Sequence, residues 1–217
     1  MAGLLLAAGA GRRAGGPKAL RTDLPGGEGR SSLRVGAAGT WVQRAVESLL
    51  TGGCEEVTVV VGAEAGRVRE VVERRRRRLG GDRPVAVVEA TDWAEGMGAS
   101  LRAGLQSLAS RGDDGPGETS AGAGVDCAIV HLVDLPDVGP EVIERLLPLA
   151  APDALARAGY ASGPGHPVLL GRTHWPGVLQ VAHGDQGARA YLRGRDVRLV
   201  DCSDLAGGAD VDTPPRS

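Results

Sequence analysis

Short apolar runs alternate with helical patterns along the chain, and this alternation constrains the fold more than any other feature. The runs are Gly3–Ala8, Glu56–Val61, Pro84–Glu89, Val125–Val133 and Val197–Val200. Apolar residues recur with helical spacing between them, at Trp41–Leu50, Glu64–Leu79, Gly98–Leu108 and Pro140–Leu149. A continuous apolar run is typical of a strand buried on both faces, as in a parallel sheet. We therefore expect an α/β fold of Rossmann-like, three-layer type with a mostly parallel sheet.

The domain organisation follows from length and from the absence of a linker. A chain of 217 residues allows one large domain or two small ones. No stretch resembles a linker with an independent core on each side, and no internal repeat occurs. We expect a single domain over residues 1–217. Residues 21–39 and 111–124 are rich in glycine and polar residues and are expected to form flexible loops.

Charge and cysteine usage exclude several classes of function. The formal net charge is −2, so electrostatics favours neither nucleic acid nor a membrane as partner. Five consecutive arginines, residues 74–78, read as the charged end of a helix, and scattered aromatic residues argue against single-strand binding. Three cysteines without metal-like or redox spacing suit a reducing compartment. Because no run approaches the ~20 apolar residues of a membrane span, we expect a cytoplasmic protein.

A glycine-rich stretch from Gly9 to Lys18 follows the first apolar run directly. Glycines allow tight turns and a close approach of the backbone to a ligand, and successive bare amides form an anion cradle. Arg13 and Lys18 add two cationic side chains to that cradle. These are the parts needed to hold a polyphosphate, although a plain glycine-rich turn is the alternative interpretation.

Two familiar phosphate-binding loops fit this stretch poorly. Gly11 and Gly16 have the spacing of a Walker loop, but a proline follows and Ala19 replaces the metal-binding hydroxyl. The segment Gly9–Ala14 matches the glycine spacing of a dinucleotide fingerprint, which also requires a helix to begin there. Two glycines and a proline at residues 15–17 oppose that helix. A dinucleotide-dependent oxidoreductase is therefore disfavoured, and a titration with NADH would decide it.

Two aspartates stand where a metal could be held. Asp134 follows the run Val125–Val133, at the carboxyl end of a strand, where ligands of open α/β sheets bind. Asp212 lies in the polar C-terminal segment. Two carboxylates that meet in space are the usual hold on a phosphate-bound Mg²⁺. The alternative interpretations are that Asp134 only starts a turn and that Asp212 belongs to a solvated acidic tail.

Taken together, these motifs resemble a known enzyme family. The ordered pattern Leu6-Ala7-Ala8-Gly9-x-Gly11-x-Arg13-x-Gly15-x-Pro17-Lys18-x-Leu20 is similar to the signature of the nucleotidyltransferases that build molybdenum cofactor dinucleotides, and most similar to their cytidylyltransferase group. Asp134-x-Pro136 and Asp212-Thr213-Pro214 match the two metal-carboxylate motifs of the family. The sequence departs from the pattern at Ala14, where methionine is common, and in the insertion at residues 21–39.

The resemblance implies a fold, a reaction and a set of residues. The fold would be of the nucleotide-diphospho-sugar transferase type. The reaction would be Mg²⁺-dependent transfer of CMP from CTP to the phosphate of a molybdenum-pterin cofactor, with release of pyrophosphate. A molybdoenzyme or its chaperone would be the protein partner.

The implied site residues fall into four groups. Arg13, Lys18 and Asp134 would be catalytic, and Asp134 and Asp212 would hold the metal. The nucleotide would contact Leu6, Ala7, Ala8, Gly9, Gly11, Arg13, Lys18, Gly98, Ser100 and Asp134. His166, Asp185 and Arg189 would border the acceptor phosphate.

The sequence leaves the nucleobase and the acceptor open. Ala8 favours the cytidine group, because the guanosine group more often has glycine there. Leu135, between Asp134 and Pro136, is not the residue usual at that position in either group. A guanylyltransferase of the same pathway is the nearest alternative, followed by a nucleotidylyltransferase for another small phosphorylated alcohol. A non-catalytic nucleotide-binding module is the alternative from another class.

Overall fold

The computed structural model describes residues 1–22, 39–78, 84–111 and 125–211. Within these residues one sheet is formed by β1 Ala2–Leu6, β2 Glu56–Val61, β3 Val85–Glu89, β4 Cys127–Leu132, β5 Leu155–Tyr160, β6 Gly163–Gly171 and β7 Arg198–Asp201. The strand order is β3-β2-β1-β4-β6-β5-β7. β6 runs antiparallel to both of its neighbours, and the other adjacent strands are parallel.

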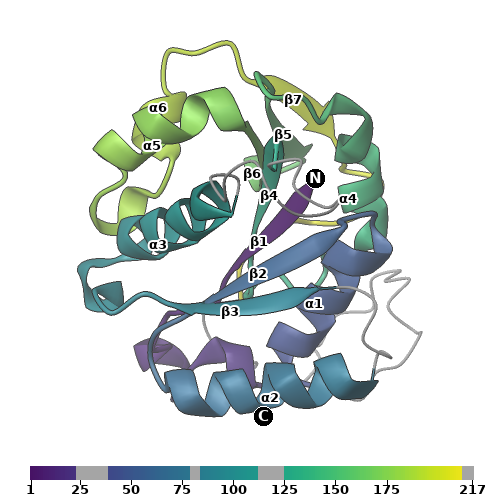
Figure 1. Ribbon diagram of the computed structural model, residues 1–217. Helices are drawn as coiled ribbons and strands as arrows, with labels where there is room; N and C mark the ends of the chain where they lie inside the picture. Colours follow the sequence, from purple (N-terminus) through teal and green to yellow (C-terminus); the bar gives the residue numbers. More distant parts are fainter. Residues whose placement is uncertain (23–38, 79–83, 112–124, 212–217) are drawn as a thin grey trace, which may run out of the picture.

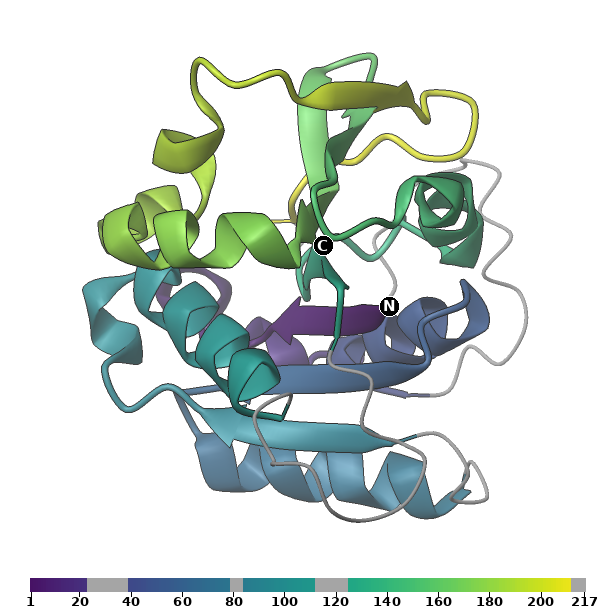
Figure 2. The same cartoon turned by 45° about the horizontal axis from the view of Figure 1, so that its top comes forward.

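Helices cover both faces of this sheet. They are α1 Trp41–Thr51, α2 Ala65–Arg78, α3 Met97–Ser110, α4 Pro140–Leu146, α5 Trp175–Val181 and α6 Arg189–Leu192. α1, α2 and α4 lie on one face, and α3, α5 and α6 lie on the other (Figures 1 and 2). The expected three-layer α/β fold with a mostly parallel sheet is therefore confirmed.

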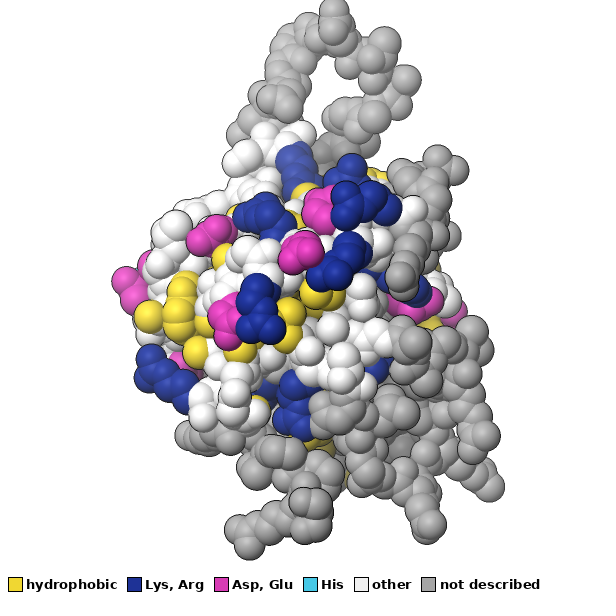
Figure 3. All heavy atoms as spheres, turned by 90° about the horizontal axis from the view of Figure 1, so that it is seen from below, with side chains coloured by type: hydrophobic (Ala, Val, Ile, Leu, Met, Phe, Trp, Pro, Cys, Tyr) yellow, Lys and Arg dark blue, Asp and Glu magenta, His cyan; other side chains and the backbone are white. Residues whose placement is uncertain are grey.

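The arginine-rich helix α2 forms part of the surface seen in Figure 3, where basic and acidic side chains are interleaved. Ion pairs there join arginines to glutamates, at 2.6 Å between Arg75 and Glu47 and at 3.2 Å between Arg74 and Glu70. The charge of this run is therefore partly offset by neighbouring carboxylates. The expectation that nucleic acid is not a partner remains a prediction.

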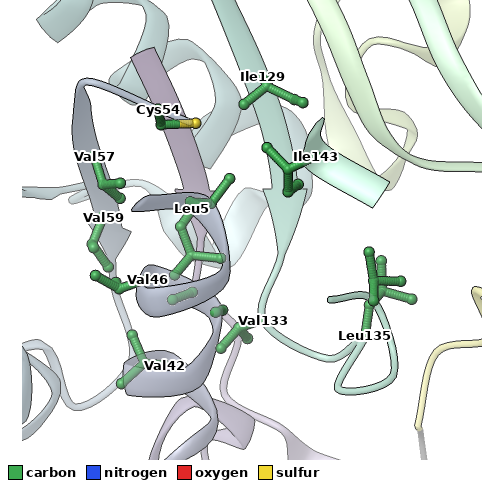
Figure 4. Packing of buried hydrophobic residues seen from close by; sticks show 14 of the residues in the cluster. Leu5, Val42, Val46, Cys54, Val57, Val59, Ile129, Val133, Leu135 and Ile143 are labelled. Carbon is green, nitrogen blue, oxygen red and sulfur yellow. The ribbon is translucent and has the colours of Figure 1, made fainter. Parts of the chain in front are cut away.

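Alternating side chains of the central strands fill two cores. Leu5 of β1 belongs to the core under α1, α2 and α4, whereas Leu4 and Leu6 belong to the core under α3 and α5. Figure 4 shows the first of these cores, in which Val42 and Val46 of α1 lie beside the strands. The chain has no phenylalanine, so valine, leucine and alanine supply most of the apolar contacts. Burial of apolar surface, at about 25 cal/mol per Å², is what holds the layers together.

The boundaries of the expected strands and helices agree with the structure to within a few residues, and α5 was not among the expected helices. The run Val125–Val133 becomes β4 over Cys127–Leu132, and the helix expected at Pro140–Leu149 ends at Leu146 and continues as a 3₁₀ turn. β5 and β6 fall outside the five expected strands. Both carry glycine, and β6 begins with Gly-Pro-Gly-His-Pro, so their intrinsic preference for strand is weak. Pairing with each other and with β4 overrides that preference.

Two expected loops lie largely outside the description. Residues 23–38 and 112–124, the greater part of the segments expected to be flexible, are not among the described residues. The single-domain organisation over residues 1–217 stays a prediction. Among the described helices, none combines the length and the apolar character that a membrane crossing requires.

Candidate functional site

A pocket of about 470 Å³ opens at the carboxyl ends of β1 and β4. Its walls come from the loop after β1, the turn before α3, the end of β4 and the turn before α6. Eight residues expected at the site line it: Leu6, Ala8, Gly9, Gly11, Lys18, Ser100, Asp134 and Asp185. This is the sheet edge at which open α/β folds bind their ligands.

The glycine-rich loop after β1 is folded into two short 3₁₀ turns, Arg12–Ala14 and Lys18–Leu20. The φ angle of Gly11 is +56°, and a Cβ atom there would lie 1.9 Å from the carbonyl oxygen of Gly16. The amides of Ala14 and Gly16 both donate to the carbonyl of Gly11, at 2.8 and 3.2 Å. Only glycine fits this closed turn. No α-helix begins in the loop, so the dinucleotide fingerprint fails as expected.

Lys18 and Asp134 meet in the pocket although 116 residues separate them. The Lys18 Nζ donates to the Asp134 Oδ2 at 2.9 Å, and the two side chains are 14% and 22% exposed. The ends of β1 and β4 are tied by the Val133 amide, which donates to the Leu6 carbonyl at 3.2 Å. A partly shielded ion pair is stronger than one in free solvent and fixes both groups in place. A cation and a carboxylate therefore face the same space.

The end of the described chain also reaches this point. The amide of Val211 donates to the carbonyl of Asp134 at 3.0 Å. Asp212, expected to be the second metal ligand, is the next residue in sequence and lies outside the described residues. The side chain of Arg13 also lies outside the description, and its backbone belongs to the first 3₁₀ turn.

Arg102 of α3 ties together the wall that faces the β1 loop. Its Nη2 donates to Asp92 at 2.8 Å and to Glu95 at 3.1 Å, while its Nη1 donates to the Ala182 carbonyl at 2.6 Å. It therefore links the turn that carries Trp93 to the segment that leads to Asp185, and both of these residues line the pocket. One guanidinium group therefore holds this wall through hydrogen bonds to three different partners.

Two expected nucleotide contacts lie elsewhere. Gly98 is buried against the segment before α6, where an added Cβ would lie 2.6 Å from the Ala182 carbonyl oxygen. Ala7 points into the core under α1 rather than into the pocket, because side chains of a strand alternate between faces. Neither residue is among those that line the pocket. Any contribution of Ala7 and Gly98 to nucleotide binding therefore comes from the backbone or from packing.

The three expected acceptor residues are divided. Asp185 lines the pocket, but His166 and Arg189 do not. Burial lowers the pKa of His166 to about 4, and the positive charges of Arg157 and Arg189 act in the same direction. The Arg157 Nε and Nη2 donate to the Gly165 carbonyl, at 3.2 and 3.1 Å. His166 and Arg189 therefore lie outside the pocket lining, and the guanidinium of Arg157 is held against the backbone next to His166.

The sequence reasoning overlooked several residues at the site. Arg12, Trp93 and Met97 line the pocket, and Arg102 braces it.

The described residues fit a metal that is shared with substrate. They contain no group of three or more histidine, cysteine or acidic side chains placed to bind a metal ion. Asp134 supplies one carboxylate, beside the point where the described chain ends. Mg²⁺ in phosphoryl-transfer sites is bound by one or two carboxylates together with water and substrate phosphates. This donor set suits such an ion and not a closed structural metal site.

Comparison with known families assigns the chain. The family model described as "MobA-like NTP transferase domain" matches residues 3–201. The protein belongs to this family. The family is one of nucleotidyltransferases, so the resemblance seen in the sequence is confirmed at that level.

Individual relatives extend over nearly the whole chain. Nicotine blue oxidoreductase of Paenarthrobacter nicotinovorans is 38% identical over 97% of this chain and 91% of its own. Among solved structures, Rv0371c of Mycobacterium tuberculosis has a TM-score of 0.66 at 23% identity, covering 98% of this chain and 92% of that one. A nucleotidyl transferase of Methanothermobacter has a TM-score of 0.65 at 23% identity over 98% of this chain and 91% of its own. Rv0371c is also solved in complex with manganese, with a TM-score of 0.62 at 22% identity, covering 97% and 92%. These likenesses confirm the fold.

Proposed function

We propose that the protein transfers CMP from CTP to the phosphate of a molybdenum-pterin cofactor and releases pyrophosphate. The observation that carries this proposal is the Lys18–Asp134 pair, at 2.9 Å, in a pocket walled by the glycine-rich loop. A cation, bare amides and a carboxylate in one space are the groups that nucleotidyl transfer needs.

The residues of the chain would act by position and charge. The acceptor phosphate is already a nucleophile, so in-line attack on the α-phosphorus requires no strong base. Lys18, Arg13 and the amides of the loop at Gly9 and Gly11 would stabilise the charge on the departing pyrophosphate. Ser100, at the pocket wall, would contact the nucleoside. Asp185 would face the acceptor from the opposite wall.

Asp134 and Asp212 would hold a magnesium ion in this proposal. A bound divalent ion would neutralise phosphate charge and align the reacting groups. Asp134 meets Lys18 in the structure, so binding of a nucleotide and metal would change the partners of both side chains. The manganese complex of Rv0371c, a protein of the same fold, supports a divalent ion here.

The base and the acceptor have ranked alternatives. The next alternative is GTP as the nucleotide in the same cofactor pathway, followed by nucleotidyl transfer to another small phosphorylated alcohol. A non-catalytic nucleotide-binding module is less favoured, because a binder has no need to keep both Lys18 and Asp134. We place the reaction in the cytoplasm, with a molybdoenzyme or its chaperone as recipient of the product. Three buried free cysteines support the reducing location.

A panel of nucleotides tests the proposal. Thermal unfolding is measured with CTP, GTP, ATP and UTP in the presence of Mg²⁺, followed by pyrophosphate release from the preferred nucleotide with the molybdenum-pterin acceptor. CTP is expected to stabilise most, and a preference of about 1.4 kcal/mol corresponds to tenfold in affinity. Stabilisation by none of the four nucleotides would overturn the proposal. GTP as the preferred nucleotide would replace CMP transfer by GMP transfer.

Oxidoreduction with a dinucleotide is the second candidate. The 38% identity with nicotine blue oxidoreductase favours it, since that relative spans nearly the same length. A loop of bare amides with Lys18 would bind the pyrophosphate of a dinucleotide as well as that of a nucleoside triphosphate. Against it stands the absence of a helix N-terminus in the loop. Saturable binding of NADH, monitored by its fluorescence, with no response to any nucleoside triphosphate, would select this candidate.

A further inference from the structure

The turn that follows β4 contacts the C-terminal end of the described chain at three points. The Asp137 Oδ2 accepts hydrogen bonds from the amides of Gly207 and Gly208, at 2.9 and 3.1 Å. The amide of Val211 donates to the Asp134 carbonyl at 3.0 Å. The segment between Gly207 and Val211 therefore lies along the turn that carries Asp134.

The turn itself is fixed before it receives this segment. Leu135 and Val138 are buried in the core under α1, α2 and α4, and the Val138 amide donates to the Leu135 carbonyl at 3.2 Å. Asp137 lies between these two anchored residues. A carboxylate that accepts backbone amides makes charge-assisted hydrogen bonds, which are stronger than those between neutral groups. Asp137 is therefore a rigidly placed acceptor for the C-terminal segment.

Tyr160 of β5 holds the same segment from a second side. The φ angle of Gly208 is +64°, and a Cβ atom added there would overlap the Tyr160 ring. That ring is buried, and its hydroxyl donates to the His166 carbonyl at 2.6 Å. Leu205 and Val211, on either side of Gly208, pack against the core. The backbone therefore passes over a fixed ring at a position where only glycine fits.

We propose that Asp137 is a positioning residue, which docks the segment from Gly207 to Val211 beside Asp134 and so keeps Asp212 within reach of the same metal ion. The role toward Asp212 rests on the proposed function, whereas the docking itself does not. Asp212 follows Val211 directly, and consecutive Cα atoms are ~3.8 Å apart across a trans peptide. Without the docking, the loss of conformational entropy in this segment would oppose binding of the ion.

Hydrogen exchange tests the docking without any ligand. Exchange of the Gly207 and Gly208 amides is followed by NMR in the full-length protein. Asp137→Ala should speed exchange of both amides about tenfold, because their acceptor is lost. Asp137→Asn keeps an oxygen acceptor without the charge and should give an intermediate rate. Asp204→Asn is the matched control, since this exposed carboxylate precedes the segment and pairs with Arg145 instead, and it should leave both rates unchanged.

Wild-type exchange rates in Asp137→Ala would overturn the docking. If Asp137→Ala fails to fold, Gly208→Ala tests the same docking from the other side. Its added Cβ atom would overlap the Tyr160 ring and should speed exchange of the Gly207 amide, although Asp137 is still present. Wild-type exchange in both Gly208→Ala and Asp137→Asn would then overturn the docking.

A manganese titration tests the role toward Asp212. Binding of Mn²⁺ alone is followed by the EPR signal of the free ion in the wild type, in Asp137→Ala, in Asp212→Asn and in the double variant. Asp137→Ala should weaken Mn²⁺ binding about tenfold, and it should have no further effect once Asp212 is replaced, because it acts through that residue. An equal loss in both backgrounds, or wild-type affinity in Asp137→Ala, would overturn the positioning role.

The two measurements also separate this proposal from the proposed function. If the wild type binds Mn²⁺ but no nucleoside triphosphate, the proposed function fails, and the comparison with the double variant still decides the positioning role. If the wild type binds no Mn²⁺, the role toward Asp212 is overturned, and hydrogen exchange decides the docking.

Discussion

Gly11 shows how a single residue shapes the site. Its left-handed backbone closes the loop after β1, and a Cβ atom there would overlap the carbonyl oxygen of Gly16. The closed turn holds Lys18 at the distance from β1 at which it meets Asp134. The backbone shape at residue 11 requires glycine, whereas Gly9 is exposed and an added Cβ atom there would meet no atom within 4 Å.

Single substitutions of Lys18 and Asp134 test the proposed chemistry of nucleotidyl transfer. Lys18→Ala and Asp134→Ala should each reduce turnover by about a hundredfold, because loss of one preorganised electrostatic contact costs roughly 3 kcal/mol in the transition state. Pyrophosphate release gives the rate, and thermal unfolding reports on the fold.

A second ion pair of similar exposure provides the control. Arg111 and Glu56 lie 2.8 Å apart at the amino end of β2, whereas the pocket lies at the carboxyl ends of the strands. Their side chains are 34% and 19% exposed. Arg111→Ala should change stability by a similar amount and leave turnover intact. Rates like the wild type in both pocket variants would contradict the assigned roles.

At the scale of elements, α3 works as a brace between two pocket walls. Arg102 binds Asp92 and Glu95 on one side and the Ala182 carbonyl on the other. Gly96, at the start of α3, permits the close approach of these segments, since a Cβ there would lie 2.5 Å from the backbone of Gly184. The wall is therefore set by contacts between elements and not by α3 alone.

Arg102→Gln should weaken nucleotide binding about tenfold, because bonds to charged groups contribute about 1.5 to 3 kcal/mol each and their loss frees the wall. Trp93, which lines the pocket, provides a fluorescence signal for the titration. Arg102→Lys keeps the charge without the planar fork and should give an intermediate affinity. Unchanged affinity in Arg102→Gln would show that the wall is held by other contacts.

For the whole molecule, a buried histidine links stability to pH. His131 in β4 is 1% exposed, and its Nδ1 has no hydrogen-bond partner among the described residues. Burial lowers its pKa to about 3 from the ordinary 6.5, and the nearby His166 contributes in the same direction. Between about pH 6.5 and 3 the unfolded chain binds a proton that the folded protein does not.

The free energy of unfolding should therefore fall as the pH drops below about 6.5, by up to roughly 1.4 kcal/mol per pH unit from His131 alone. Above that pH this contribution is constant. Urea unfolding at pH 7, 6 and 5 measures the slope. His131→Leu should flatten it relative to the wild type, while His183→Gln, at an exposed position, should not. Equal slopes in all three proteins would refute the prediction.

Local pattern was enough to predict most of the fold and part of the site. The alternation of runs located β1 to β4, β7 and the first four helices, because apolar runs and helical spacing are patterns of neighbouring residues. It failed at β5 and β6, whose glycines and prolines carry no strand signal of their own. The placement of Asp134 after β4 was predictable, because a strand end next to an acidic residue is a local feature.

By itself the sequence determined the layered α/β architecture, a glycine-rich loop after the first strand and the position of Asp134 at a strand end. Only the tertiary structure decided that Lys18 meets Asp134, that Gly98 is buried against another segment, and that Arg157 donates to the Gly165 carbonyl beside His166. The physical reason is the distance along the chain over which each kind of interaction acts. Backbone preference and burial act between near neighbours, whereas these contacts depend on elements far apart in the sequence packing side by side, as the parallel pairing of β1 with β4 brings Lys18 to Asp134.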